Sequence, residues 1–247
     1  MTNQNSSKNN ELQKLSGTIE ELRCTRDWAN FVFSESEHTA LGVVAIAASL
    51  VGAAAQAEST ATSDMLEEAD YLEFSLAGEP VKGWVWRSPF SNGDKVEVVA
   101  EWQGDHFEAY AIARPADSII ALYPHCSRGR TSHWINAAKW WLIGSAFTVG
   151  LLVTMFLIHS LIFSPSWAKT AKNLSDLIPF SAAVLVLMAF VSTVLLAKRW
   201  MSYVRLAEHV FHELGWSSPG TIDLKKRSRR QRRSTDTAEY GVFFFRY

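Results

Sequence analysis

Cysteine is scarce in this sequence of 247 residues, which contains only Cys24 and Cys126. A small secreted domain held together by disulfides carries a much denser set of cysteines, so that class is excluded. We expect both residues to be free thiols. Cys126 follows His125, but no second pair of ligands stands at the spacing of a zinc site. The sequence therefore predicts neither a disulfide framework nor a metal site at Cys126.

Catalytic signatures are also missing. The sequence has no Gly-x-Ser-x-Gly elbow, no phosphate-binding loop and no dinucleotide fingerprint. His209 and His212 lie one helical turn apart, but their spacing differs from the His-Glu-x-x-His motif of zinc proteases and no third ligand accompanies them. We expect these two histidines to lie on a solvated face, and we expect a protein that is not an enzyme and has no cofactor.

Charge is absent from two long apolar stretches, residues 141–163 and 177–197. As helices of 23 and 21 residues they would each measure roughly 31–35 Å at about 1.5 Å per residue, enough to cross a hydrocarbon core of about 30 Å. Buried core helices would show a polar stripe, which neither stretch has. Tryptophan, which favours the headgroup layer, stands at their ends. Residues 134–197 are thus predicted to form a transmembrane hairpin. The flanking tryptophans are Trp134, Trp140, Trp141, Trp167 and Trp200.

Lysine and arginine are concentrated outside this hairpin. Arg128, Arg130 and Lys139 precede or open the first span, and a dense basic run follows the second, whereas the expected loop 164–176 has two lysines. Cytoplasmic flanks of membrane helices carry the excess of Lys and Arg. We therefore expect a multi-pass protein with both termini in the cytoplasm.

A third apolar run, residues 40–57, lies in an Ala-rich insertion, residues 36–58, that we expect to be helical. The run ends in Ala-Gln-Ala, which mimics a signal-peptidase site, but it lacks the basic region and N-terminal position of a secretory signal. Ala, Gly and Ser contribute little to insertion, which disfavours a third span. We favour a helix or helical hairpin that packs on the soluble domain or rests on the membrane surface.

Short strand patterns dominate residues 11–127. Segments 16–24, 71–88, 93–115 and 117–124 alternate apolar and polar residues around turn residues such as Gly78-Glu79-Pro80 and Gln103-Gly104-Asp105. About five short antiparallel strands predict a small barrel, and residues 92–99 resemble the fourth strand of an OB-fold. A sandwich-like meander is the alternative. The fold class is accordingly an α+β membrane protein with a β-rich soluble head, preceded by a polar, disordered segment 1–10.

Charge is divided unevenly along the chain. Residues 1–130 contain 19 acidic and 10 basic residues, whereas residues 131–247 contain 6 acidic and 14 basic residues. The aromatic residues of the head would suit an oligonucleotide groove, but its acidic charge repels phosphate. We expect no nucleic-acid binding by the head, and we interpret its aromatics as core with one protein-binding face.

The segment 198–247 is predicted to contain an amphipathic juxtamembrane helix ending at Gly215, a polybasic run and a terminal strand. Next to a membrane, the simplest partner of the basic run is a layer of anionic lipid headgroups. The aromatic run 239–247 would promote aggregation if exposed, so we expect it to pair with the sheet of the head or with a partner. The expected lipid-contacting residues are Lys225, Lys226, Arg227, Arg229, Arg230, Arg232 and Arg233.

Small residues in the spans predict close helix packing, within the hairpin or between copies of the chain. These are Ala146 and Gly150 in the first span and Ala189 and Thr193 in the second. His159 is the one ionisable residue in the two stretches. An intramembrane histidine is a functional candidate, but His159 lies near the end of its span and can reach the interface.

The order of segments resembles a family of small membrane proteins of Gram-negative bacteria described as type VI secretion system effectors. The resemblance covers most of the chain and is carried by residues 26–42, 78–101, 113–130 and 239–247, of which "RPADSIIALYPHCSRGR" is the most specific. It implies a role in interbacterial competition at the inner membrane, but no catalytic residues.

Two functions fit this setting. The first is an effector whose hairpin inserts into a target membrane and oligomerises into a pore or leak. The second is a resident inner-membrane immunity or adaptor protein that binds a toxin, a chaperone or a secretion component through its head. Spans this apolar would need a chaperone before export, which favours the resident protein on physical grounds. The family resemblance favours the effector, which is the primary prediction from the sequence.

Overall fold

The computed structural model describes residues 11–29, 31, 66–163 and 167–247, and the chain forms two compact units. One unit combines Met1–Ser132 with Trp200–Tyr247, and the other is His133–Arg199. The predicted disordered segment 1–10 lies outside the described residues, as does the whole of the predicted insertion 36–58.

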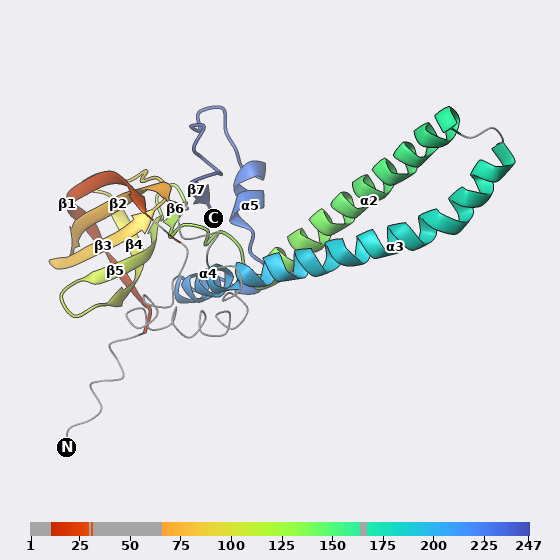
Figure 1. The fold of residues 1–247 in the computed structure, drawn as a ribbon. Helices are drawn as coiled ribbons and strands as arrows, with labels where there is room; N and C mark the ends of the chain where they lie inside the picture. Colours follow the sequence, from red (N-terminus) through yellow and green to blue (C-terminus); the bar gives the residue numbers. More distant parts are fainter. Residues whose placement is uncertain (1–10, 30, 32–65, 164–166) are drawn as a thin grey trace, which may run out of the picture. The chain divides into compact units, whose positions relative to one another are not determined.

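Five strands of the first unit form a closed β-barrel (Figure 1). The order β3-β2-β1-β4-β5 is antiparallel throughout, and a parallel pairing of β3 with β5 closes it, with Val81 opposite Phe107. This confirms the predicted barrel and excludes the sandwich-like alternative. The strands are β1 (Gln13–Ala29), β2 (Glu67–Leu76), β3 (Glu79–Val85), β4 (Lys95–Trp102) and β5 (Phe107–Arg114).

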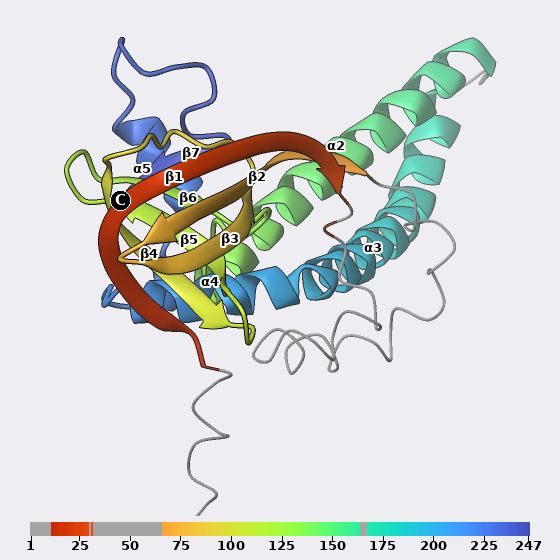
Figure 2. The same ribbon diagram turned by 90° about the vertical axis from the view of Figure 1, so that its left-hand side faces the viewer.

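Strand β1 pairs with two neighbours in succession, and Figure 2 shows it curving around the barrel. Residues 13–18 pair with β4 and residues 19–29 pair with β2, with an irregularity between Glu20 and Arg23. Glu21 lies there at a φ of 54°, and such a bulge bends and twists its strand. The sequence predicted only residues 16–24 as a strand, because the exposed end of β1 does not alternate.

Both hairpin turns fall close to their predicted positions. Ala77 and Gly78, with φ of 54° and 86°, join β2 to β3, one residue before the predicted turn. Two consecutive residues at positive φ are what a type I′ hairpin turn requires. Between β4 and β5, the Gln103 amide donates to the His106 carbonyl at 2.9 Å and Gly104 has a φ of 100°. The predicted second hairpin is therefore confirmed.

Helix α4 (Met201–Glu213) covers one outer side of the barrel. The barrel interior holds one apolar core, and a second core joins α4 to the outward faces of β4, β5 and β6 (Ile119–Leu122). The amphipathic helix expected from the sequence is thus present, with its apolar face already packed on the barrel. The α4 side chains in this core are Tyr203, Leu206, Ala207, Val210 and Phe211.

Gly215 ends α4 in the left-handed conformation, with a φ of 76°. Its amide donates to the His212 carbonyl at 2.8 Å, and the Trp216 amide donates to the Phe211 carbonyl at 3.0 Å. These two bonds form a Schellman motif, and the rings of Trp216 and Phe211 stack at 5.3 Å. The predicted helix end at Gly215 is confirmed.

The end of the chain folds back onto the barrel unit. After the 3₁₀ helix η1 (Pro219–Thr221) and helix α5 (Leu224–Arg230), strand β7 (Phe244–Arg246) pairs antiparallel with β6. Ile120 lies opposite Phe245 in this pairing. The aromatic run therefore pairs with the head's own sheet, the first of the two partners predicted for it.

The second unit lies within a helical hairpin of α2 (Arg130–Phe163) and α3 (Trp167–Arg199). The two helices are long and apolar enough to cross a membrane, because 18-residue windows within Arg130–Ser160 and Pro179–Arg199 have mean hydropathies of 2.1 and 2.5. The predicted loop 164–176 is too long, because helix α3 already begins at Trp167. The polar residues from Trp167 onward can be helical because the backbone hydrogen bonds of a helix do not require apolar side chains.

Candidate functional site

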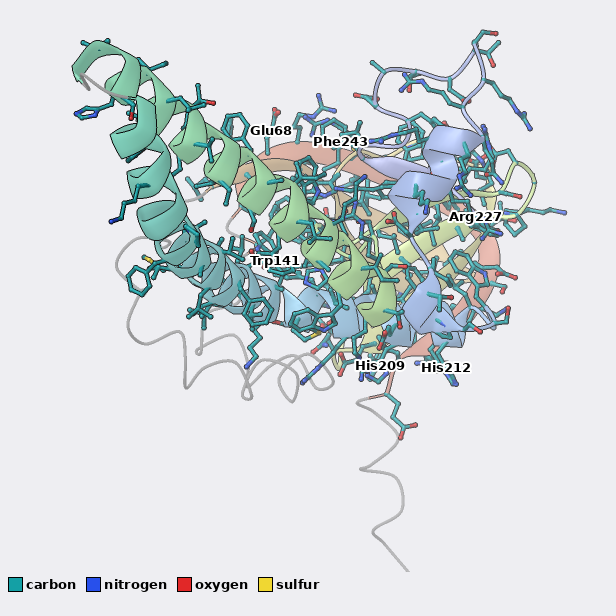
Figure 3. All side chains as sticks on the ribbon, turned by 90° about the vertical axis from the view of Figure 1, so that its right-hand side faces the viewer. Glu68, Trp141, His209, His212, Arg227 and Phe243 are labelled. Atoms are coloured by element: carbon teal, nitrogen blue, oxygen red, sulfur yellow. The ribbon has the colours of Figure 1, made fainter. Side chains whose placement is uncertain are left out.

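The predicted lipid-contacting run forms helix α5 and the turn after it. The Asp223 carboxylate accepts from the Lys226 amide at 2.9 Å and caps the helix. Leu224 and Ser228, four residues apart and therefore on one face, are completely buried. All seven basic residues of the run are exposed, and Figure 3 labels Arg227 on α5. The helix thus separates an anchoring face from a basic face.

Helix α5 is held firmly by its buried face. The Leu224 amide donates to the Ser127 carbonyl at 3.1 Å, and the Ser228 hydroxyl accepts from the Arg246 amide of β7 at 2.9 Å. Arg128 forms an ion pair with Asp223 at 3.0 Å. The basic run is therefore part of a folded domain, and its charges have defined positions on the surface.

A nearly buried ion pair secures the segment between α5 and β7. Arg246 contacts the Asp236 carboxylate through both terminal nitrogens, at 3.0 and 3.3 Å, and its guanidinium lies 4.7 Å from the Tyr240 ring centre. The hydrogen bonds from Arg246 lower the pKa of Asp236. Bidentate contacts between arginine and a carboxylate fix orientation as well as adding energy.

The basic face of α5 lacks compensating acidic partners in the part of the chain that the structure describes. Within those residues, Lys225, Lys226, Arg227, Arg229 and Arg230 form no ion pair. Desolvation, and secondarily the nearby Arg128 charge, lower the pKa of Lys225. Asp223 offsets part of the charge at Lys225, and the face as a whole presents a net positive potential, which favours contact with anions.

A cavity of about 200 Å³ lies next to α5 within the barrel unit. Its walls come from the start of β2, the end of β3, the segment after β6, α5 and the tail around β7. Four aromatic residues line it, together with four polar groups. The aromatic residues are Trp86, Tyr123, Phe243 and Phe245, and the polar residues are Glu67, His125, Ser127 and Lys225.

His125 and Glu67 form a hydrogen bond with each other inside this cavity. The His125 Nε2 lies 2.8 Å from a Glu67 carboxylate oxygen, and the backbone of His125 has a φ of 69°. The imidazole also lies 5.1 Å from the Trp86 ring and 4.8 Å from the Trp200 ring, measured between centroids. Burial lowers the pKa of His125, while Glu67 opposes this shift. A neutral imidazole at pH 7 is the result.

The predicted helix-packing residues fall on different sides of the hairpin. Ala189 and Thr193 are partly buried, and the Thr193 hydroxyl donates to the Ala189 carbonyl at 2.8 Å. Ala146 and Gly150 are exposed, and no atom lies within 4 Å of a Cβ placed on Gly150. Ser145, only 8% exposed, belongs to the buried side of α2 instead. The structure does not bring the four residues together.

Other residues singled out from the sequence lie apart from the cavity. His209 and His212 are exposed on the outer side of α4, as Figure 3 shows, so both lie on the predicted solvated face. Among the described residues, no group of three His, Cys, Asp or Glu side chains is arranged to hold a metal ion. Both cysteines are free thiols, Cys24 exposed and Cys126 buried, and desolvation raises the pKa of Cys126.

Sequence reasoning missed most of the cavity. It singled out His125 only as a neighbour of Cys126, and it assigned Trp86 and the other head aromatics to the core. Glu67 precedes His125 by 58 residues, and no short motif links the two. A run of basic residues next to a terminal aromatic run was the only local signal, and both of those segments do contribute to the cavity.

Comparison of the chain with protein-family models, with curated proteins and with solved structures finds no match in any of the three. The resemblance to type VI secretion effectors therefore stays a prediction. Functional assignment depends on the geometry of the barrel unit, its basic face and the two long helices.

Proposed function

We propose that the chain is a resident two-span membrane protein that holds an OB-like barrel domain at the cytoplasmic surface of a bacterial inner membrane. The composition of the barrel unit carries this proposal. That unit combines residues before and after the hairpin, Met1–Ser132 and Trp200–Tyr247. A hairpin whose two ends enter one folded domain must return to the side of the membrane from which it left.

Several contacts join the two parts of that domain. Strand β7 pairs with β6, and α4 shares an apolar core with β4 and β5. The Arg130 side chain contacts Glu208 at 2.8 Å, and the Ser132 hydroxyl donates to the Thr221 carbonyl at 2.6 Å. Separation of the two parts by a bilayer would break all of these contacts. The basic flanks then assign both termini to the cytoplasm.

The surface of the hairpin fits a lipid environment. Only 6% of each apolar window is buried, and Phe147 and Phe180 are each 73% exposed. Soluble monomers rarely expose apolar patches of more than a few hundred Å². A hydrocarbon layer would cover this surface, while the backbone bonds of both helices are satisfied internally.

The strand order supports an OB-like assignment of the barrel. A three-stranded meander, β1 to β3, is followed by β4 and β5, and the ring closes through β3 and β5. This is the connectivity of the five-stranded Greek-key barrel that binds ligands in many unrelated proteins. The basic face of α5 would contact anionic headgroups, and the remaining barrel surface would bind a toxin or secretion component.

Membrane-impermeant maleimide labelling tests the topology in the full chain. The exposed Cys24 should react in inside-out membrane vesicles and stay unreacted in spheroplasts. A Lys169→Cys substitution in a Cys24→Ser background should give the opposite pattern. Reaction of both positions from one side would disprove the two-span topology, and exchange of the two patterns would disprove the orientation.

An effector that forms a pore or leak is the second candidate, favoured by one observation. Ala146 and Gly150 lie open on the exposed side of α2, where small residues permit close packing with a second copy. Expression of the chain alone should then collapse the membrane potential of the host cell, and Gly150→Leu should prevent the collapse. A resident adaptor or immunity protein should leave the potential unchanged in both cases.

A further inference from the structure

The cavity beside α5 combines an apolar body with two charged groups, the Glu67 carboxylate and the Lys225 ammonium. Glu67 is engaged by His125 at 2.8 Å, so the carboxylate already has a polar partner. Lys225 forms no ion pair within the described residues, and Arg128 adds a repulsive positive charge near it. Lys225 lies on the exposed face of α5 and lines the cavity, so an anion that enters the cavity can pair with its ammonium.

The walls of the cavity define the rest of the ligand. Trp86, Tyr123 and Phe243 offer aromatic surface, and Phe245 is almost completely buried behind it. Val242 also lines the cavity and is 50% exposed, so its apolar wall continues to the protein surface. The volume of about 200 Å³ is smaller than the roughly 300–1,000 Å³ of sites that enclose drug-sized ligands. The cavity therefore suits one part of a larger amphipathic molecule.

We propose that the cavity binds a single anionic phospholipid, with its phosphate at the Lys225 ammonium and its glycerol and adjoining apolar part against the aromatic walls. The apolar chains would leave past Val242. The position of Lys225 on α5 joins this site to the basic face, where Lys226 and Arg229 point to solvent. The choice of a lipid over a soluble anion rests on the proposed membrane-surface location.

Binding of short-chain lipid to the full chain tests the proposal. The purified protein in maltoside micelles is mixed with dihexanoylphosphatidylglycerol, and bound lipid is counted by native mass spectrometry. Dihexanoylphosphatidylcholine and glycerol 3-phosphate serve as the neutral headgroup and the soluble anion. We expect one phosphatidylglycerol per chain, and at least tenfold weaker binding of the other two compounds.

Two neighbouring lysines supply a matched pair of variants. Lys225 lines the cavity, whereas Lys226 carries the same charge on the same helix and does not. Lys225→Gln should weaken binding at least tenfold, and Lys226→Gln less than twofold. Val242→Asp, which places a negative charge at the exposed rim, should also weaken binding. Circular dichroism of each variant checks that the barrel unit is still folded.

Three results would overturn the proposal. Equal losses in Lys225→Gln and Lys226→Gln would mean that general surface charge alone attracts the lipid. Equal binding of glycerol 3-phosphate would mean that the apolar walls contribute nothing. No saturable binding would remove the site altogether. In each case the maleimide labelling of Cys24 would still decide the proposed topology independently.

Discussion

Arg246 and Asp236 form a two-point ion pair that ties strand β7 to the turn following α5. The pair measures 3.0 Å and 3.3 Å between nitrogen and oxygen atoms, and both side chains are only about one tenth exposed. The Arg246 backbone amide also donates to the Ser228 hydroxyl of α5 at 2.9 Å. The basic helix, the terminal strand and the cavity between them therefore depend on one another.

Asp236→Asn should loosen this region. Since Arg246 lowers the pKa of Asp236, the folded state favours the ionised carboxylate. The stabilisation is therefore fully present at neutral pH and is lost as pH falls through that lowered pKa. We expect a lower melting temperature at pH 7 and faster amide exchange in Phe244–Arg246. Asp105→Asn, at a side chain 83% exposed, is the control, and equal effects of the two variants would contradict the prediction.

The barrel unit should need both of its chain segments. A protein with residues 11–132 joined by a Gly-Ser linker to residues 200–247 should be soluble and unfold cooperatively. Residues 11–132 alone should bind a hydrophobic dye and aggregate, because α4 and β7 no longer cover the apolar outer face of the barrel. Circular dichroism and dye fluorescence measure both outcomes. Cooperative unfolding of residues 11–132 alone would show that the second core is dispensable.

Charge on the basic face should govern lipid binding by this linked domain. A variant with four Arg→Gln substitutions should lose on the order of 4 kcal/mol of binding free energy to anionic vesicles, at about 1 kcal/mol for each charge. The loss should be smaller at physiological salt. The substituted residues are Arg229, Arg230, Arg232 and Arg233. Lys at the same positions should retain most of the binding. Vesicle co-sedimentation over a salt series measures this. Equal binding to neutral vesicles would contradict the electrostatic explanation.

Free shuffling of residues 225–233 is not a clean control for this prediction. Ser228 is completely buried and bonded to Arg246, and most shuffled sequences would place a larger Arg or Lys side chain in this buried position. Loss of lipid binding would then follow from misfolding. Conservative Arg→Lys changes at exposed positions preserve the buried face. Because they keep the positive charge but change the geometry of the side chain, they show which of the two the lipid recognises.

His125 should make the stability of the linked domain depend on pH. Burial lowers its pKa below the unfolded value of about 6.5, so the unfolded chain binds a proton more readily. This contribution is complete above pH 6.5 and falls as pH decreases toward the folded pKa. Glu67 and Lys225, the charged groups around His125, act in opposite directions. Urea unfolding at pH 7.5 and 5.5 measures the change.

His125→Gln is the matching variant, because it removes the titrating group and retains a hydrogen-bond donor for Glu67. The difference in urea midpoint between the two pH values should shrink in this variant. The exposed His212→Gln should leave the difference as it is in the native chain. An unchanged difference in His125→Gln would assign the pH dependence to other groups.

Local pattern was sufficient for much of the fold. Alternation in β4 and the glycine at the following turn predicted that hairpin, because side chains of a strand alternate between faces. The missing charge in residues 141–163 and 177–197 predicted two long apolar helices, and Gly215 predicted a helix end. Each of these signals depends on neighbours within a few residues, so the sequence alone contains it.

Tertiary structure decided the site. The sequence placed seven basic residues in one run, but only the burial of Leu224 and Ser228 determines which way they face. It predicted an amphipathic juxtamembrane helix at α4 but not that its apolar face packs on the barrel, because a membrane surface and a protein core favour the same periodicity. His125 meets Glu67 across 58 residues of chain. Contacts between distant segments depend on how the whole barrel closes, and no local pattern records that.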